Sequence, residues 1–116
     1  MHNFRELKIW NKSMERPTEM YKATSNFPSE EKYGLTSQMR RCAVSIPSNI
    51  AEGAGRNSNG EFRQFLGIGN GSCFELETQV LLSNKLNLID DKSIEPLLKV
   101  IDELQKMNYK PQESKG

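Results

Sequence analysis

Apolar residues recur at helical spacing in four stretches of the chain, and short polar stretches separate them. The first stretch, about residues 3–26, has the 3-4-3-4 spacing of a packed helix, carried by Leu7, Trp10, Met14, Pro17 and Tyr21. A proline inside a helix removes a backbone donor and costs about 3 kcal/mol. Pro17 therefore predicts either a kink in this helix or a helix that begins late.

The second helix is expected at about residues 31–55 and has two distinct sides. Its apolar side consists of Leu35, Met39, Cys42, Ala43, Ile46 and Ile50. The opposite side, which we call the polar stripe, consists of Arg41, Ser45, Ser48, Glu52 and Arg56, with Gln38 and Asn49 at its border. Pro47 interrupts this segment although the apolar spacing continues past it.

The third helix is expected at about residues 59–86, and Ser58 with Glu61 forms a capping box at its start. Its buried side would consist of Phe62, Phe65, Leu66, Gly69, Cys73, Leu76 and Val80. Glycines within it indicate a flat surface that another helix approaches closely, within the chain or between subunits: Gly67, Gly69 and Gly71. The expected counterpart is the small run Ala51, Gly53, Ala54 and Gly55. The alternative, a phosphate-binding loop, lacks the lysine and the preceding strand of a P-loop.

The fourth helix follows Asp90 or Asp91, either of which can cap it. Its stripe is regular: Ile94, Leu97, Leu98, Ile101 and Leu104. No segment alternates with the period of a strand. The pattern predicts an all-α, antiparallel up-and-down four-helix bundle that forms one domain over residues 1–110, with a flexible polar tail at 111–116.

Composition narrows the class of protein. Only 35% of the 116 residues are hydrophobic, which suits a small bundle or an oligomer that shares burial between subunits. No apolar run is long enough to cross a membrane and no signal peptide is evident, so we expect a cytoplasmic protein without a membrane partner. Cys42 and Cys73 fall on apolar faces and are expected to be buried reduced thiols.

The residues that carry catalysis in helical bundles are missing. His2, at the amino terminus, is the only histidine of the chain. A single histidine in this position argues against the Glu-x-x-His pattern of di-iron bundles, against a Ser-His or Cys-His pair and against imidazole-ligated zinc. Glu75 and Glu77 are two residues apart and point to different faces of a helix. We therefore expect no catalytic residue, no metal and no cofactor, and a protein that is not an enzyme.

Basic residues are distributed unevenly although the net charge is only +1. Residues 33–84 contain four basic residues and no lysine: Arg40, Arg41, Arg56 and Arg63. A guanidinium can grip a phosphate or a carboxylate with two hydrogen bonds. The polar stripe is compatible with a solvated face, a protein interface or a surface for a nucleic acid backbone.

Residues 27–79 contain a series of distinctive motifs: FPSEEKYGL, QMRR, SIPSNIAEG, the Arg56 that follows it, and Gly71-Ser72 with Glu75 three residues later. Together these motifs resemble the 23S rRNA intervening sequence proteins of bacteria. The resemblance implies a four-helix bundle that assembles into a homopentamer and has no established catalytic activity. Related accessory proteins of diversity-generating retroelements bind nucleic acid and a reverse transcriptase. Because Pro47 belongs to the family motif, it indicates a built-in bend of the second helix.

The resemblance, carried onto this sequence, suggests two groups of functional residues. The candidates for phosphate contacts are Arg40, Arg41, Arg56 and Arg63. The candidates for interface or structural roles are Ser45, Pro47, Asn49, Glu52, Gly69, Ser72 and Glu75. Because no aromatic residue lies among the arginines, we expect backbone recognition of a structured RNA or duplex DNA without base stacking. The alternative is a protein-interaction scaffold that binds no nucleic acid and uses the polar stripe as its interface.

Overall fold

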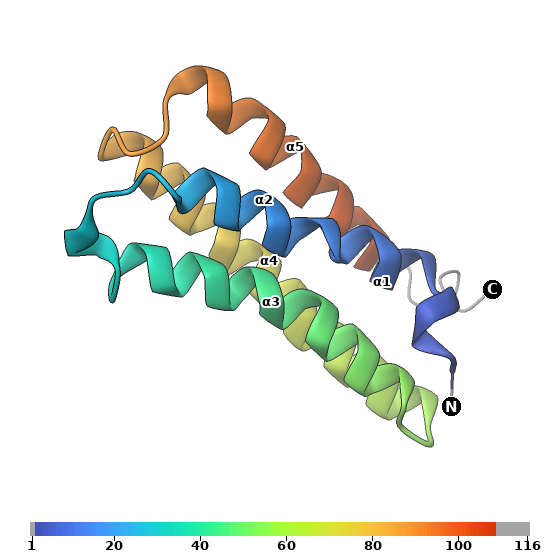
Figure 1. Ribbon diagram of the computed structural model, residues 1–116. Coiled ribbons are helices and arrows are strands. Elements are labelled where there is room, and N and C mark those ends of the chain that lie inside the picture. The colour runs from blue at the N-terminus through green and yellow to red at the C-terminus, as the bar shows by residue number, and fades with distance from the viewer. Residues whose placement is uncertain (1, 109–116) are drawn as a thin grey trace.

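The computed structural model describes residues 2–108, and this part of the chain contains helices and no strand. The elements in order are η1 (Phe4–Glu6), α1 (Lys8–Ser13), α2 (Glu15–Thr24), η2 (Ser29–Glu31), α3 (Leu35–Ala54), α4 (Asn59–Lys85) and α5 (Asp91–Asn108) (Figure 1). Since α1 and α2 are two parts of one interrupted helix, the protein has the predicted all-α, four-helix architecture. The predicted tail, 111–116, lies outside the described residues.

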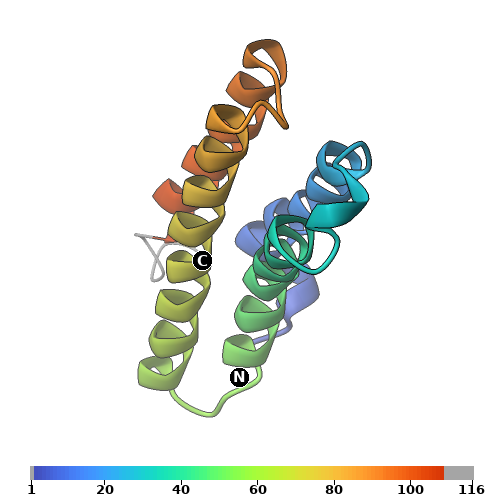
Figure 2. The ribbon, with the colours of Figure 1, turned by 90° about the vertical axis from the view of Figure 1, so that its left-hand side faces the viewer.

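The helices pack around one core, and the most extensive contact is between α3 and α4. The turn at residues 55–58 connects α3 to α4, and the two helices lie side by side (Figures 1 and 2). α5 lies against α4. α1 and α2 cover the remaining side, between α3 and α5. The up-and-down order and the bend at Pro47 stay predictions. Among residues 2–108, no helix is long and apolar enough to span a membrane.

The predicted stripe of the first helix is right only at its start, where Leu7 is buried and Trp10 packs against the core. Met14 and Tyr21 are 46% and 48% exposed, whereas the buried residues of α1 and α2 are Ile9, Ser13, Arg16, Met20 and Thr24. Several of the core-facing positions are polar, so the apolar residues beside them gave a misleading stripe. The Ser13 and Thr24 hydroxyls are satisfied within the helix, since they donate to the carbonyls of Trp10 and Met20, each at 2.7 Å.

The first helix is interrupted three residues before Pro17, which had predicted a kink or a late start, although α1 already begins at Lys8. Met14 stays in the right-handed helical region, with φ −70° and ψ −15°, but lies outside both helices, and α2 begins at Glu15. Pro17 is then in the first turn of α2, where backbone amides have no partner within their helix. The proline therefore costs α2 no hydrogen bond of its own.

The other three helices bury the predicted faces. α3 begins at Leu35, later than predicted, because residues 29–31 form the short helix η2. The Ser58 hydroxyl accepts from the Glu61 amide at 3.2 Å, which confirms the predicted cap of α4. Asp90 caps α5 by accepting from the Ser93 amide at 2.8 Å, and hydrogen bonds from Ser93 lower the pKa of the Asp90 carboxyl.

The close approach between α3 and α4 is centred on Gly53, one of the small residues expected on α3, and not on the glycines of α4. A Cβ on Gly53 would lie 2.6 Å from the Cβ of Phe65 and 3.1 Å from the Phe62 ring. Gly69 faces Ile46 at ordinary contact distance, and Gly67 and Gly71 have nothing within 4 Å. Gly53 therefore takes part in the predicted close approach, but its partners on α4 are Phe62 and Phe65 and not the glycines of that helix.

Candidate nucleic-acid interface

Ser45, Asn49 and Ser72 form a polar network between α3 and α4. The Ser45 and Ser72 hydroxyls lie 2.8 Å apart, and the Asn49 amide donates to the Ser45 carbonyl at 2.8 Å and hydroxyl at 3.0 Å. Gly69 lies opposite Asn49, where a Cβ would be 3.8 Å from the Asn49 Cβ. This part of the polar stripe is thus occupied in joining two helices of the same chain.

The remaining structural candidates lie at different depths. Pro47 is buried inside α3, whereas Glu52 and Glu75 are exposed.

Both cysteines are buried, and burial is the main cause that raises the pKa of the Cys42 thiol to about 11 and that of Cys73 to about 12. These thiols are therefore protonated at neutral pH and do not form a reactive site.

The four candidate arginines lie in two separate groups. Arg40 and Arg41 are in the second turn of α3, while Arg56 follows the end of α3 and Arg63 is in the second turn of α4. The helical rise puts roughly 20 Å of α3 between Arg41 and Ala54. None of the four arginines forms an ion pair within the part of the chain that the structure describes.

Arg40 holds α3 against α2. Its Nε donates to the Thr24 hydroxyl at 2.8 Å and one terminal nitrogen donates to the Tyr21 carbonyl at 3.4 Å. Its guanidinium carbon lies 4.3 Å from the centroid of the Tyr21 ring. Arg40 is half-buried and its orientation is fixed by these contacts.

A shallow hollow of about 460 Å³ lies beside Arg40, which we call the basic groove. It is lined by Tyr21, Lys32, Tyr33, Thr36, Ser37, Arg40, Arg41 and Val44, a set without a carboxylate. The Lys32 ammonium lies 5.6 Å from the centroid of the Tyr33 ring. The expectation that no aromatic residue lies among the arginines is therefore wrong, because folding brings Tyr21 and Tyr33 beside Arg40 and Arg41.

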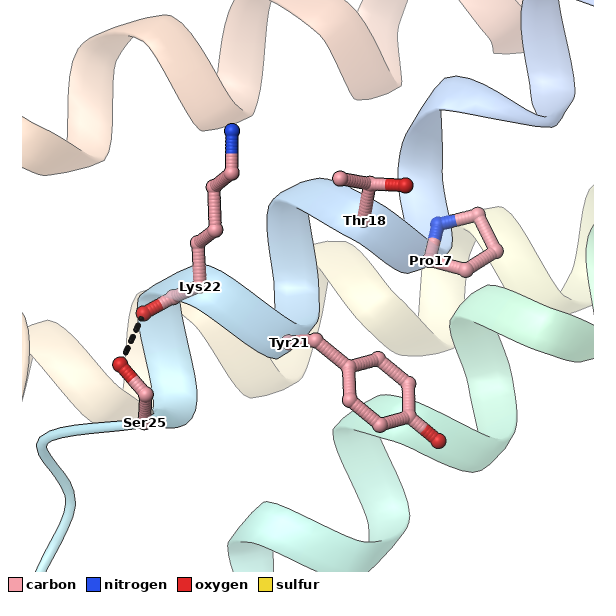
Figure 3. A pocket seen from close by; sticks show the side chains of 5 residues that line it. All are labelled: Pro17, Thr18, Tyr21, Lys22 and Ser25. Carbon is pink, nitrogen blue, oxygen red and sulfur yellow. Dashed lines mark hydrogen bonds between the residues drawn. The ribbon is translucent and has the colours of Figure 1, made fainter.

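Tyr21 separates the basic groove from a neighbouring hollow on α2. That second hollow, of about 510 Å³, is lined by Pro17, Thr18, Tyr21, Lys22 and Ser25 (Figure 3). Tyr21 points toward α3, whereas Lys22 extends toward α5. Only Tyr21 lines both hollows, so Lys22 does not add its charge to the basic groove.

The second group of arginines lies at the turn between α3 and α4. Arg56 and Arg63 are both exposed, and the Arg56 guanidinium carbon lies 4.8 Å from the centroid of the Phe65 ring. Phe65 is half-buried beneath it, where it packs on Gly53. This group offers cations, and the Phe65 ring is already contacted by the Arg56 guanidinium.

Arg16 is a buried charge that sequence reasoning missed. Its side chain is 1% exposed, and Glu15 is its one ion-pair partner among the described residues, at 3.4 Å. Nε and one terminal nitrogen have no hydrogen-bond partner, and burial lowers the pKa of the guanidinium. The sequence held one signal for the burial of Arg16, which is its helical spacing. Arg16 is three residues after Ser13 and four before Met20, so it falls on the side that α2 buries.

Within residues 2–108, no three side chains of His, Cys, Asp or Glu gather closely enough to hold a metal ion.

Tyr33 and Lys32, which line the basic groove, are two further site residues that sequence reasoning missed. Tyr33 lies two residues before the start of α3 and falls outside every predicted apolar stripe, which was the one signal for its exposure.

The profile of the family described as 23S rRNA-intervening sequence protein matches residues 5–110. The chain belongs to this family. A crystal structure of a protein of unknown function of the S23 ribosomal protein family from Bacteroides thetaiotaomicron has a similar fold, with a TM-score of 0.77.

That relative is 23% identical in sequence, and the similarity covers 86% of this chain and 94% of the other. At this identity the likeness concerns the fold alone. No curated protein matches this 23S rRNA-intervening sequence protein.

Proposed function

We propose that this family member is a non-enzymatic, oligomeric bundle that binds structured nucleic acid. Its arginine side chains would contact the phosphate backbone of that nucleic acid. The observation that carries the proposal is the state of Arg41, Arg56 and Arg63. All three are exposed, and none forms an ion pair with a carboxylate among the described residues. A phosphate can therefore bind them without displacing an existing ion pair.

The partner expected from the name of the family is structured RNA, with duplex DNA as the related possibility. Arginine contacts to phosphates position a protein on nucleic acid without reading its sequence. The net charge of +1 is small, so binding would depend on local clusters of cations. A homopentamer, which the resemblance implies, would repeat each cluster five times around a ring.

An exposed apolar face on α4 supports the oligomeric part of the proposal. Ile68, Phe74, Leu81 and Leu82 are each between 42% and 50% exposed, and Gly67 and Gly71 leave open space beside them. At about 100° per residue, Phe74 and Leu81 lie toward one flank of the side that α4 turns away from its core-facing stripe. Ile68 and Leu82 lie toward the other flank, with Gly67 and Gly71 between the two pairs. Exposed apolar surface of this kind is typical of interfaces between proteins.

The same face favours the second candidate function, a protein-interaction scaffold that binds no nucleic acid. Its partner would be another copy of the chain or a protein of the reverse-transcriptase kind. In that case Arg41, Arg56 and Arg63 would contact acidic side chains of the partner. Neither function needs a cofactor, and both keep the cytoplasmic location expected from the sequence.

The two candidates are separated by titrating a labelled rRNA hairpin and a labelled DNA duplex at two salt concentrations. The test variant is Arg41→Glu/Arg63→Glu, and the matched control is Lys92→Glu/Lys99→Glu, which makes the same change in charge at exposed positions of α5. We expect the test variant to lose binding and reduce the salt slope by about 0.9 for each duplex phosphate contact.

The control should bind within about threefold of the unmodified protein, and light scattering should report the same oligomer for all three. Absence of binding by an intact oligomer would reject the nucleic-acid function and leave the scaffold. Equal losses in test and control variants would mean that binding depends on overall charge and not on these arginines.

A further inference from the structure

We propose that the basic groove binds an unpaired nucleotide of an RNA strand, with the base stacked on Tyr33 and its phosphate held by Lys32 and Arg41. This inference rests on the proposed function, because it names the part of the nucleic acid that this group of cations receives. It differs from the expectation of backbone contacts alone, since it adds a site for a base.

Tyr33 is the platform for the base. Its side chain is 87% exposed, the largest exposed fraction among the exposed large hydrophobic residues of the described chain. It is placed in the turn between η2 and α3, so the core has no use for its ring. Stacking on an exposed aromatic ring is how many proteins bind unpaired bases, because every base has a flat face to offer.

Cationic side chains line the same hollow as this platform. Lys32 lies 5.6 Å from the Tyr33 ring centroid, and the exposed Arg41 lines the same hollow. Arg40 uses two nitrogens on Thr24 and Tyr21, which leaves further N–H donors on a guanidinium whose position is already fixed. A fixed donor loses less conformational entropy when a phosphate binds.

The size and polarity of the groove suit a nucleotide. Its volume of about 460 Å³ is within the range of small-molecule sites. The Thr36 and Ser37 hydroxyls line it and can bond to base edges or sugar, and Val44 adds an apolar contact. The neighbouring acid Glu31 accepts from the Leu35 amide at 3.3 Å, at the start of α3, and it is not among the lining residues.

The decisive experiment compares two labelled RNAs with the same stem, one closed by an unpaired loop and one a blunt duplex. Tyr33→Ala should weaken loop binding by about 10- to 100-fold, as expected for the loss of one stacked base, and leave duplex binding within about twofold. Tyr33→Phe keeps the ring and should bind both RNAs like the unmodified protein. Ultraviolet cross-linking of a loop with 4-thiouridine should label the peptide that contains Tyr33.

Each outcome has one meaning. Arginine-dependent duplex binding that Tyr33→Ala leaves intact, together with unchanged loop binding, would overturn this inference and preserve the proposed function. Absence of any RNA binding would overturn both and assign the groove to a protein ligand. Competition by free uridine or adenosine monophosphate as strong as that by the loop RNA would overturn the assignment to a strand and indicate a mononucleotide site.

Discussion

Arg16 illustrates how one side chain can oppose the fold that contains it. A buried guanidinium loses its hydration, and two of its three nitrogens recover no hydrogen bond from the protein. Glu15 compensates weakly because its own side chain is 56% exposed. Arg40 behaves differently, since its bonds to α2 replace part of the water that it loses. The free-energy cost of burying the guanidinium therefore differs between the two arginines, because it depends on partners that lie elsewhere in the fold.

Replacing Arg16 by methionine should therefore stabilise the protein. Arg16→Met removes a buried, incompletely paired charge and keeps much of the apolar volume, so we expect the free energy of unfolding to rise by about 1–3 kcal/mol. Urea denaturation measures the change. The control, Lys22→Met, alters an exposed cation of the same helix and should shift stability by less than about 0.5 kcal/mol. A loss of stability in Arg16→Met would show that the guanidinium gains a partner in the assembled protein.

Within single helices, short-range signals account for most of the observed boundaries. Ser58 and Asp90 begin α4 and α5 through hydrogen bonds to amides three residues later, a relation that is local in sequence. The glycines of α4 carried no such local information about their neighbours. Whether a helical glycine touches another helix depends on how the two are packed, and here Gly53 of α3 does so while Gly71 of α4 does not.

Alanine at these two glycines should have opposite effects on stability. Gly53→Ala would force a methyl group to within 2.6 Å of the Phe65 Cβ, so we expect a loss of about 1–3 kcal/mol. Gly71→Ala meets nothing within 4 Å and restores helix propensity, which predicts a gain of about 0.5–1 kcal/mol. Thermal and urea unfolding of both variants measure the difference. A loss for Gly71→Ala equal to that of Gly53→Ala would mean that another copy covers that face tightly.

The molecule as a whole has surfaces of two kinds on different elements. The basic groove lies between α2 and α3, and the exposed apolar face lies on the outer side of α4. Few residues of the chain are hydrophobic, so each one that an isolated monomer leaves exposed on this face is a loss of favourable burial. Assembly through α4 would cover it and leave the basic groove accessible to nucleic acid.

Charges on the outer face of α4 should therefore separate the subunits. Phe74→Glu/Leu81→Glu introduces two carboxylates where burial is expected, so light scattering should report a mass near the 13.2 kDa of one chain. Thr18→Glu/Ser93→Glu adds the same charge at exposed positions of α2 and α5 and should retain the mass of the unmodified oligomer. A homopentamer would have five times the mass of the chain. An unmodified protein that is already monomeric, or a variant that stays assembled, would contradict this assignment of the interface.

Sequence reasoning alone established the helical class, the faces of α3, α4 and α5, the caps of α4 and α5, and the family. It could do so because helix caps and apolar stripes connect residues only three or four positions apart. The depth of Arg16, the contact of Gly53 with Phe65, and the meeting of Tyr33 with Arg41 required the folded chain. These features arise where separate helices meet, and their energies depend on partners far away in sequence: Arg40, for example, contacts Thr24 sixteen residues earlier.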